Sequence, residues 1–274
     1  MPKTFICALP TPFDGQNRID TDSYIKLIER VQPYADGLLA LGTTAEAQLL
    51  NADEKTELLS ITRQFCPLPL IAGIEQASTA AAAKEAEHYA KLGADMLLIA
   101  PPPFCKCTVK GYICHVEEII KASGLPVMLY NIPSRAGYGL DIEAVAELAY
   151  SRGVRYIKDS CNNVDFAKRV RPYADVLCGS DEMLDEYLDC GASGAVSVAG
   201  NYAPKQTRQI LDCGTDEEKT EFKKLARLAA AEINPIAIKY MLYKAGVFAT
   251  YSVRLPLTSA NRQTRDTIDG ALGI

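Results

Sequence analysis

Three side chains in the middle of the chain have the types and the spacing that imine chemistry needs. Lys158 ends a short apolar run that is typical of a buried strand, and Tyr130 and Arg135 lie one strand–helix unit before it. Burial disfavours charge, so an amine in apolar surroundings is more often the neutral nucleophile. A tyrosine can carry the protons that imine formation requires, and an arginine can bind a carboxylate through two parallel hydrogen bonds. A lone lysine is usually solvated and inert, but this set favours an imine with a small keto acid.

The composition limits the classes of protein to which this chain can belong. The chain has 274 residues, 48% of them hydrophobic and 23% charged, with a net charge of −5 and dispersed basic residues. This balance argues against a nucleic-acid surface or an anionic membrane as the main partner. The first residues lack the apolar core of a signal peptide, and no apolar run reaches the length of a membrane span. Nine scattered cysteines fit a reducing compartment better than a disulfide framework, so we expect a cytoplasmic protein.

Short apolar runs alternate with segments of helical period, which predicts a parallel sheet wrapped by helices. The expected strands are Phe5–Leu9, Gly37–Leu41, Leu68–Ala72, Asp95–Ala100, Pro126–Tyr130, Val154–Lys158, Asp175–Cys178 and Ala195–Val198. The expected helices between them are Thr21–Tyr34, Asp53–Phe65, Ser78–Leu92, Gly111–Ser123, Asp141–Tyr150 and Asp181–Cys190. Eight strands in about 200 residues predict a (β/α)8 TIM barrel. A doubly wound open sheet is the alternative, but no glycine-rich phosphate loop follows the first strand.

The last quarter of the chain predicts additional helices. They span Pro204–Leu211, Asp216–Glu232 and Pro235–Ala245, and a last helix follows Leu257. We expect residues 1–202 to form the barrel core and residues 203–274 to pack on it as a C-terminal helical appendage.

Residues with possible roles in chemistry gather at the expected strand ends, where a barrel of this kind carries its active site. They are Gly42–Glu46 after the second strand, Pro101–Phe104 after the fourth, Tyr130–Arg135 after the fifth, Lys158 at the sixth and Gly179–Asp181 after the seventh. One Gly-Thr-Thr turn would be weak evidence, since these are common loop residues. All of these segments converge on one rim, and together they favour a single active site.

These motifs carry a resemblance to a known group of enzymes over nearly the whole chain. The motifs are Ala8-Leu9-Pro10-Thr11-Pro12-Phe13, Gly42-Thr43-Thr44-x-Glu46, Tyr130-Asn131-Ile132-Pro133-Ser134-Arg135-x-Gly137, Ile157-Lys158-Asp159-Ser160, Asn234-Pro235-Ile236-x-Ile238-Lys239 and Arg254-Leu255-Pro256-Leu257. The chain resembles the pyruvate-dependent class I aldolases, the superfamily of dihydrodipicolinate synthase and N-acetylneuraminate lyase. The arginine motif and the two C-terminal motifs lean towards the dihydrodipicolinate synthases.

The resemblance implies a Schiff-base lyase that joins pyruvate to L-aspartate 4-semialdehyde and needs no cofactor or metal. Lys158 would form the imine, while Tyr130 and Thr43 would pass protons. Thr44 and nearby backbone amides would hold the pyruvate carboxylate, and Arg135 the carboxylate of the aldehyde. The remaining expected site residues, which would line the pyruvate pocket, are Gly179 and Val196. The resemblance also implies a homotetramer, built as a dimer of dimers.

The chain departs from the pattern of its relatives at three positions. Pro103 and Phe104 occupy places where the family usually has tyrosines, one of which completes a proton relay across a dimer contact. Phe104 keeps the aromatic ring but lacks the hydroxyl. Thr108 and Tyr112 are nearby candidates to replace that hydroxyl, although neither stands at the position of the family's tyrosine. Ala45 replaces a usual glycine, which predicts a negative φ there. The missing hydroxyl at Phe104 keeps two alternatives open: an aldolase for 2-keto-3-deoxy sugar acids or a related hydroxy-keto acid, and a non-catalytic protein that binds a keto acid. The Lys158-Asp159-Ser160 motif also supports the first, because it equally resembles the lyase and sugar-acid aldolase branches.

Two further expectations concern ligands other than substrate. The residues at the places of a lysine feedback site are Ala47, Gln48, Ala52, Lys55, Ala77, Ala81 and Pro103. They offer few carboxylates or hydroxyls, and the Lys55 ammonium would repel a cation, so we expect no inhibition by lysine. Cys105, Cys107, Cys114 and His115 are the one cluster with zinc-ligand types, but their spacing matches no common zinc motif. We therefore expect no metal site.

Overall fold

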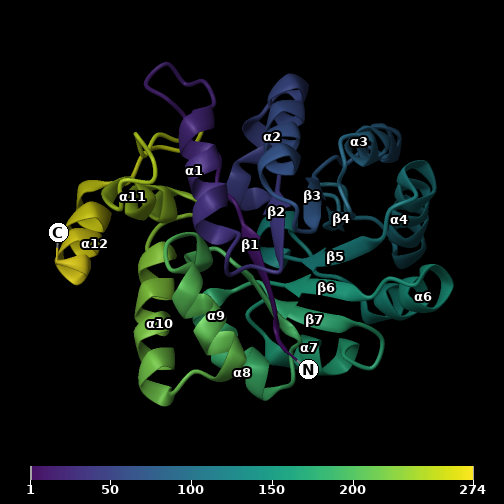
Figure 1. Ribbon diagram of the computed structural model, residues 1–274. Helices are drawn as coiled ribbons and strands as arrows, with labels where there is room; N and C mark the ends of the chain where they lie inside the picture. The colour runs from purple at the N-terminus through teal and green to yellow at the C-terminus, as the bar shows by residue number, and fades with distance from the viewer. Residues whose placement is uncertain (1, 274) are drawn as a thin grey trace.

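Eight parallel strands close into a barrel in the computed structural model, which describes residues 2–273 (Figure 1). Each strand pairs with the next along the chain, and β8 pairs with β1. The strands are β1 (Thr4–Ala8), β2 (Gly37–Ala40), β3 (Leu70–Ile74), β4 (Met96–Ile99), β5 (Val127–Asn131), β6 (Tyr156–Asp159), β7 (Asp175–Cys178) and β8 (Gly194–Ser197). The predicted (β/α)8 barrel is confirmed, and the open sheet is excluded.

Alternation along the strands decides which side chains enter the barrel. In β5, Met128 and Tyr130 belong to the interior cluster, whereas Val127 and Leu129 pack under the outer helices. In β6, Ile157 is likewise in the outer layer. Successive side chains point to opposite faces, so Lys158 points into the barrel. The interior cluster consists of Ile6, Ala8, Leu39, Ile71, Leu98, Met128, Tyr130, Ile132, Leu177 and Val196.

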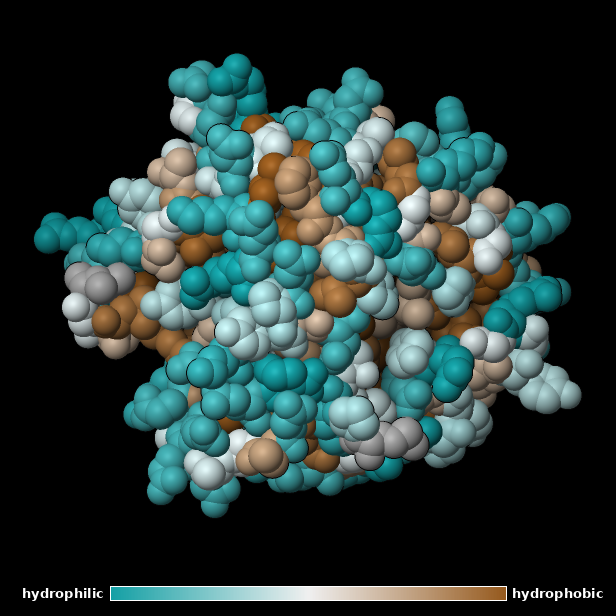
Figure 2. Space-filling model, in the orientation of Figure 1, coloured by the Kyte–Doolittle hydropathy of each residue, from teal (hydrophilic) through white to brown (hydrophobic). Residues whose placement is uncertain are grey.

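Helices that follow the eight strands form the outer layer of the barrel (Figure 1). They are α1 (Thr21–Val31), α2 (Ala52–Phe65), α3 (Thr79–Lys91), α4 (Val109–Ser123), α6 (Ile142–Arg152), α7 (Val164–Val170), α8 (Leu184–Asp189) and α9 (Pro204–Cys213). Hydrophilic residues cover most of the face in Figure 2, with smaller hydrophobic patches between them. Among residues 2–273, no helix combines the length and the apolar character that a membrane span would need.

Capping side chains mark the starts of three outer helices. The side chains of Asp20, Asn51 and Asp141 accept hydrogen bonds from the first turns of α1, α2 and α6. Asp181 instead opens the short 3₁₀ turn η3 (Asp181–Met183), and its carboxylate accepts from the backbone amides of Val198 and Ala199, both at 2.8 Å. This bond draws Val198 out of the strand, so β8 ends at Ser197 rather than Val198.

Two local differences from the sequence-based elements have clear causes. Gly153 ends α6 in the left-handed conformation, and Val154 bonds back to Leu148. Therefore β6 begins at Tyr156, two residues later than expected. Helix α7 was not predicted, because its seven residues are too few to show a clear helical period.

The chain after the barrel strands packs against the rim rather than extending away from it. Helices α10 (Asp216–Ala229), α11 (Ile236–Lys244) and α12 (Arg262–Leu272) lie on the side of α1 and α9 (Figure 1). Lys239 and Glu46 form an ion pair at 2.6 Å with both side chains fully buried, and the Arg254 backbone amide donates to the same carboxylate at 2.9 Å. These bonds anchor the C-terminal segment to the turn after β2. The division of the chain into residues 1–202 and 203–274 stays a prediction.

Candidate active site

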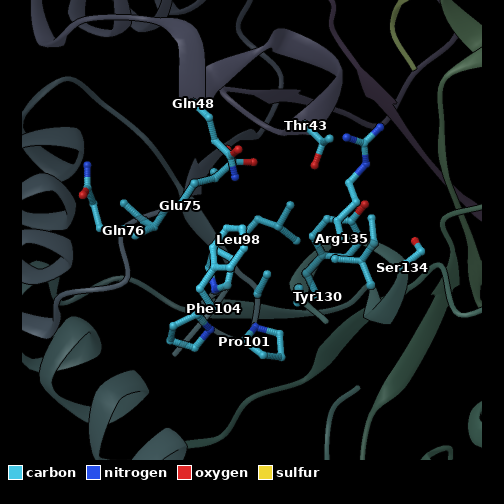
Figure 3. Close-up of a pocket in the computed structure, with 17 residues that line it drawn as sticks. Thr43, Gln48, Glu75, Gln76, Leu98, Pro101, Phe104, Tyr130, Ser134 and Arg135 are labelled. Atoms are coloured by element: carbon cyan, nitrogen blue, oxygen red, sulfur yellow. The ribbon is translucent and has the colours of Figure 1, made fainter. Parts of the chain in front are cut away.

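Two adjoining cavities open at the carboxyl ends of the strands, with volumes of about 370 and 540 Å³. Figure 3 shows the first of them, with side chains from several loops converging on one space. The wall that both cavities share consists of Thr43, Tyr130, Ile132, Ser134 and Arg135. The segments that the sequence placed at strand ends therefore do meet at one rim.

Tyr130 of this shared wall and Lys158 are buried neighbours. They stand opposite each other in the register of β5 and β6, and the Lys158 Nζ lies 4.2 Å from the centroid of the Tyr130 ring. Both side chains are almost fully enclosed, with 4% and 6% of their surface exposed. An amine and a phenol hydroxyl thus lie side by side in a sheltered place; Tyr130 lines both cavities, whereas Lys158 is not among the residues that line them.

Gly179 leaves the space that the lysine side chain occupies. A Cβ atom at this position would lie 3.1 Å from both Cγ and Cε of Lys158 and 2.2 Å from the Ser160 Oγ. Gly179 also lines the larger cavity. Any side chain here would press on the lysine, because a closely packed interior has no spare volume to receive it.

The turn after β2 carries the two threonines that the sequence singled out. Thr43 begins the 3₁₀ turn η1 (Thr43–Ala45) and lines both cavities, whereas Thr44 is buried. The left-handed residue of this turn is Glu46, with φ of 56°. Ala45 is not among the residues with positive φ, as its identity predicted.

Asn234 connects the threonine turn to the predicted arginine. Its side-chain Nδ2 donates to the Thr44 Oγ1 at 2.9 Å, and its backbone carbonyl accepts from the Arg135 guanidinium at 3.0 Å. Arg135 lies in the short helix α5 (Pro133–Ala136), and Figure 3 shows its side chain reaching towards Thr43. The motif that contains Asn234 was recognised from the sequence, but this bridging role was not.

A buried hydrogen-bond network fixes the end of β6 beside Lys158. The carboxylate of Asp159 accepts from the Asn131 amide at 2.9 Å, from the Tyr187 hydroxyl at 2.8 Å and from the Cys161 backbone at 3.1 Å. Burial and the nearby carboxylate raise the pKa of Tyr187 well above its ordinary value, so this phenol stays a donor. The network restricts the backbone that carries the lysine.

Val196 lies deeper in the barrel interior than the other predicted site residues. It belongs to the barrel interior together with Tyr130, and it is fully buried. The cavity wall at this strand is formed instead by Val198, two residues further on. The structure thus places Val196 under the site rather than on its surface.

Glu75 is a cavity residue that the sequence did not single out. It directly follows β3 and lines the smaller cavity with Gln48 and Gln76 (Figure 3). Burial raises its pKa to about 7, against the opposing charges of Lys55, Arg135 and Lys158. The expected third strand ended at Ala72, so an acid three residues later was not recognised as a strand-end residue.

Three other residues named from the sequence, for the proton relay, the lysine site and the zinc-type cluster, do not contact Lys158 and Tyr130. Phe104 has φ of 62° and a fully exposed ring at the cavity mouth. Lys55 forms an ion pair with Glu85 at 2.8 Å. His115 hydrogen-bonds Thr79 at 2.9 Å, and no group of three or more His, Cys, Asp or Glu side chains is arranged to hold a metal within residues 2–273.

Comparison with known proteins agrees with this geometry. Residues 1–273 match the sequence profile of the dihydrodipicolinate synthetase family. A 4-hydroxy-tetrahydrodipicolinate synthase of Rickettsia bellii is 30% identical over 97% of this chain and 95% of its own length. The enzyme of the same name from Pseudoalteromonas atlantica is 32% identical over 96% of this chain and 94% of its own.

Solved structures extend the likeness to the fold. The chloride-inhibited dihydrodipicolinate synthase from Acinetobacter baumannii, solved with pyruvate, is 30% identical with a TM-score of 0.91, covering all of this chain and 98% of that one. The synthase of Thermotoga maritima is 29% identical, with the same TM-score and the same coverage. The match to the family profile over the whole chain confirms the resemblance seen in the motifs, and the chain belongs to the dihydrodipicolinate synthetase family.

Proposed function

We propose that this protein is a 4-hydroxy-tetrahydrodipicolinate synthase, a lyase that condenses pyruvate with L-aspartate 4-semialdehyde in the pathway to diaminopimelate and lysine. The observation that carries the proposal is the buried pair of Lys158 and Tyr130 beneath a cavity lined by Arg135. The names of full-length relatives at about 30% identity support the same activity.

In the proposed reaction, the Lys158 amine attacks the keto carbon of pyruvate and water is lost. The resulting iminium loses a methyl proton and becomes an enamine, which attacks the aldehyde carbon. The iminium itself withdraws the electrons, so this chemistry needs no cofactor. Tyr130 and Thr43 pass protons, which fits their places on the shared wall above the lysine.

The other predicted residues bind and shape the substrates in this proposal. Thr44 holds the pyruvate carboxylate, and its hydroxyl is already oriented by Asn234. Arg135 holds the carboxylate of the aldehyde, since its guanidinium lines both cavities. Gly179 sets the shape of the pyruvate end of the site, and Val196 packs beneath it. Fixing both reactants removes much of the entropic barrier to carbon–carbon bond formation.

Borohydride trapping with pyruvate, followed by peptide mass mapping, tests the proposed imine. A reduced adduct on Lys158 is expected. A folded protein with no adduct, or with one elsewhere, would favour a keto-acid-binding protein without this chemistry. Steady-state turnover with L-aspartate 4-semialdehyde then tests the aldehyde.

An aldolase for 2-keto-3-deoxy sugar acids is the second candidate. One observation favours it: Gln48, Glu75 and Gln76 line one side of the smaller cavity, and such groups can bind hydroxyls. Arg135 favours instead an aldehyde that bears a carboxylate. Comparing kcat/KM for aspartate semialdehyde condensation with that for 2-keto-3-deoxygluconate cleavage separates the two.

We also propose that the protein works in the cytoplasm as a homotetramer. The fully exposed ring of Phe104, beside Pro101, Pro102 and Pro103 at the cavity mouth, supports contact with another copy. Light scattering at micromolar concentration tests the assembly, and a monomer there would contradict it.

A further inference from the structure

We propose that Glu75 is the proton donor and acceptor of this active site, exchanging protons with the hydroxyls of Tyr130 and Thr43 during imine and enamine formation. The inference rests on the proposed function, because it assumes that Lys158 forms an imine with pyruvate. It assigns the acid–base step to a residue that neither the motifs nor the names of the relatives identify.

The first argument is the position of Glu75 on the barrel. It follows β3, which is hydrogen-bonded to β2, and the turn after β2 carries Thr43. The two strand ends approach very closely at Gly73, where a Cβ atom would lie 2.2 Å from the Leu41 carbonyl oxygen and 3.1 Å from the Gly42 nitrogen. Glycine at this position therefore allows the Glu75 loop to lie against the threonine turn.

The second argument is that the carboxylate is free to act in the cavity. Residues 2–273 form no hydrogen bond to the Glu75 carboxylate, and Figure 3 shows its end beside that of Gln48 within the cavity. Among the described residues lining this cavity, Glu75 is the only carboxylic acid. A partly buried acid without a structural partner is suited to exchange protons with a neighbouring hydroxyl.

The charged groups around Glu75 come from four other elements. Lys55 of α2, Arg135 of α5 and Lys158 of β6 favour its carboxylate, whereas Glu85 of α3 opposes it. Lys55 is already paired with Glu85, and Arg135 with the carbonyl of Asn234. Within residues 2–273, none of the three cations forms an ion pair with Glu75, and burial has the largest effect on its pKa.

The resulting balance suits acid–base chemistry near neutral pH. Burial raises the pKa of Glu75 to about 7, so both protonation states are well populated there. General acid–base catalysis is most efficient when the pKa lies close to the working pH.

The other candidate proton carriers near the rim are engaged elsewhere. Phe104 has no hydroxyl. Thr108 caps α4 by accepting from Gly111 at 3.1 Å. Tyr112 is buried and donates to the Ile99 carbonyl at 3.4 Å. Neither of these two residues lines the cavity.

The proposed proton transfers balance over the half-reaction with pyruvate. Neutral Lys158 adds to the keto carbon, and one of its N–H protons passes to the former keto oxygen to give the carbinolamine. Protonated Glu75 supplies, through the hydroxyls, the second proton with which this oxygen leaves as water. This step forms the C=N bond of the iminium and leaves Glu75 ionised. The carboxylate then receives the proton lost from the methyl group, and the C–H electrons form the enamine double bond. Glu75 ends as it began, and no oxidant or reductant is required.

Exchange of the pyruvate methyl protons in D₂O, followed by NMR without any aldehyde, tests this inference. Glu75→Gln keeps the shape and removes the titrating group, so exchange should slow by about 100-fold or more. In the wild type, the exchange rate should change with pH near 7, where Glu75 titrates. In Glu75→Gln, this change of the exchange rate with pH should disappear. Glu75→Asp should recover part of the rate, because it restores an acid. Glu147→Gln, an exposed position on α6, is the matched control.

Different results separate the failure of this inference from that of the proposed function. If Glu75→Gln exchanges pyruvate protons at the wild-type rate with the wild-type pH profile, the inference is wrong. The same conclusion follows if only the KM for the aldehyde rises, since Glu75 would then bind the acceptor. If the wild type forms a Lys158 adduct and exchanges pyruvate but does not condense aspartate semialdehyde, the proposed activity fails while the role of Glu75 stands. If the wild type forms no adduct, both are wrong.

Discussion

Substitution of Gly179 by alanine should separate the chemistry of the site from its stability. The new Cβ would lie 2.2 Å from the Ser160 Oγ and 3.1 Å from Cγ and Cε of Lys158. The Ser160 Oγ is buried without a hydrogen-bond partner, so it can rotate away without losing a bond. The lysine has no such freedom, because its chain is enclosed and its Nζ must stay near the Tyr130 ring.

The expected magnitudes follow from these contacts. Overpacking by one methyl group costs about 1–3 kcal/mol of folding free energy, and rotation of Ser160 should keep the loss near the lower end. Relief of the contact with Lys158 must shift the amine by a few tenths of an ångström or more. Displacement of a reacting group by about 1 Å can reduce the rate about 100-fold. We therefore expect a small loss of stability with a large loss of imine formation.

Urea unfolding and borohydride trapping with pyruvate measure the two effects on the same protein. The double variant Gly179→Ala/Ser160→Ala removes the closest overlap but keeps the contact with the lysine. Compared with Gly179→Ala alone, it should recover stability and still form the adduct slowly. If Gly179→Ala trapped pyruvate at the wild-type rate, the idea that this glycine sets the position of Lys158 would be refuted.

Four further expectations follow from the geometry. Glu75→Gln should raise the free energy of unfolding by about 1–3 kcal/mol at pH 8 but not at pH 4. The folded-state pKa near 7 exceeds the unfolded value, so the wild type loses stability as pH rises from about 4.5 to 7; urea titrations at both pH values check this. Lys239→Met should lower stability by about 3–5 kcal/mol in the same assay, because Glu46 would remain buried without its partner. Arg135→Ala should raise the KM for the aldehyde at least about tenfold, because a charged hydrogen bond is lost, while borohydride trapping of pyruvate continues. If pyruvate trapping fell as much as aldehyde binding, the assignment of Arg135 to the aldehyde carboxylate would be contradicted. Millimolar lysine should leave turnover unchanged, and a clear fall would show that the predicted lack of a feedback site is wrong.

The amino-acid sequence determined the barrel and the place of its active site. Alternating strand and helix periods are local signals, and parallel strands joined by helices all end at the same rim. For this reason the prediction brought Thr43, Tyr130, Arg135 and Gly179 to one pair of cavities. The expected strand Asp175–Cys178 has the observed bounds, whereas ends controlled by distant partners, such as that of β8, differ by one or two residues.

Only the tertiary structure decided how these residues are held and what else joins them. Asn234 orients Thr44 from 190 residues away, Lys239 pairs with Glu46 from 193 residues away, and no local pattern encodes such partners. Glu75 acquires its pKa near 7 from burial among groups on four other elements, which its sequence neighbours do not reveal. Periodicity and turn chemistry act over a few residues and thus fix the elements. Burial, close approach and electrostatic balance arise only when elements distant in sequence pack together.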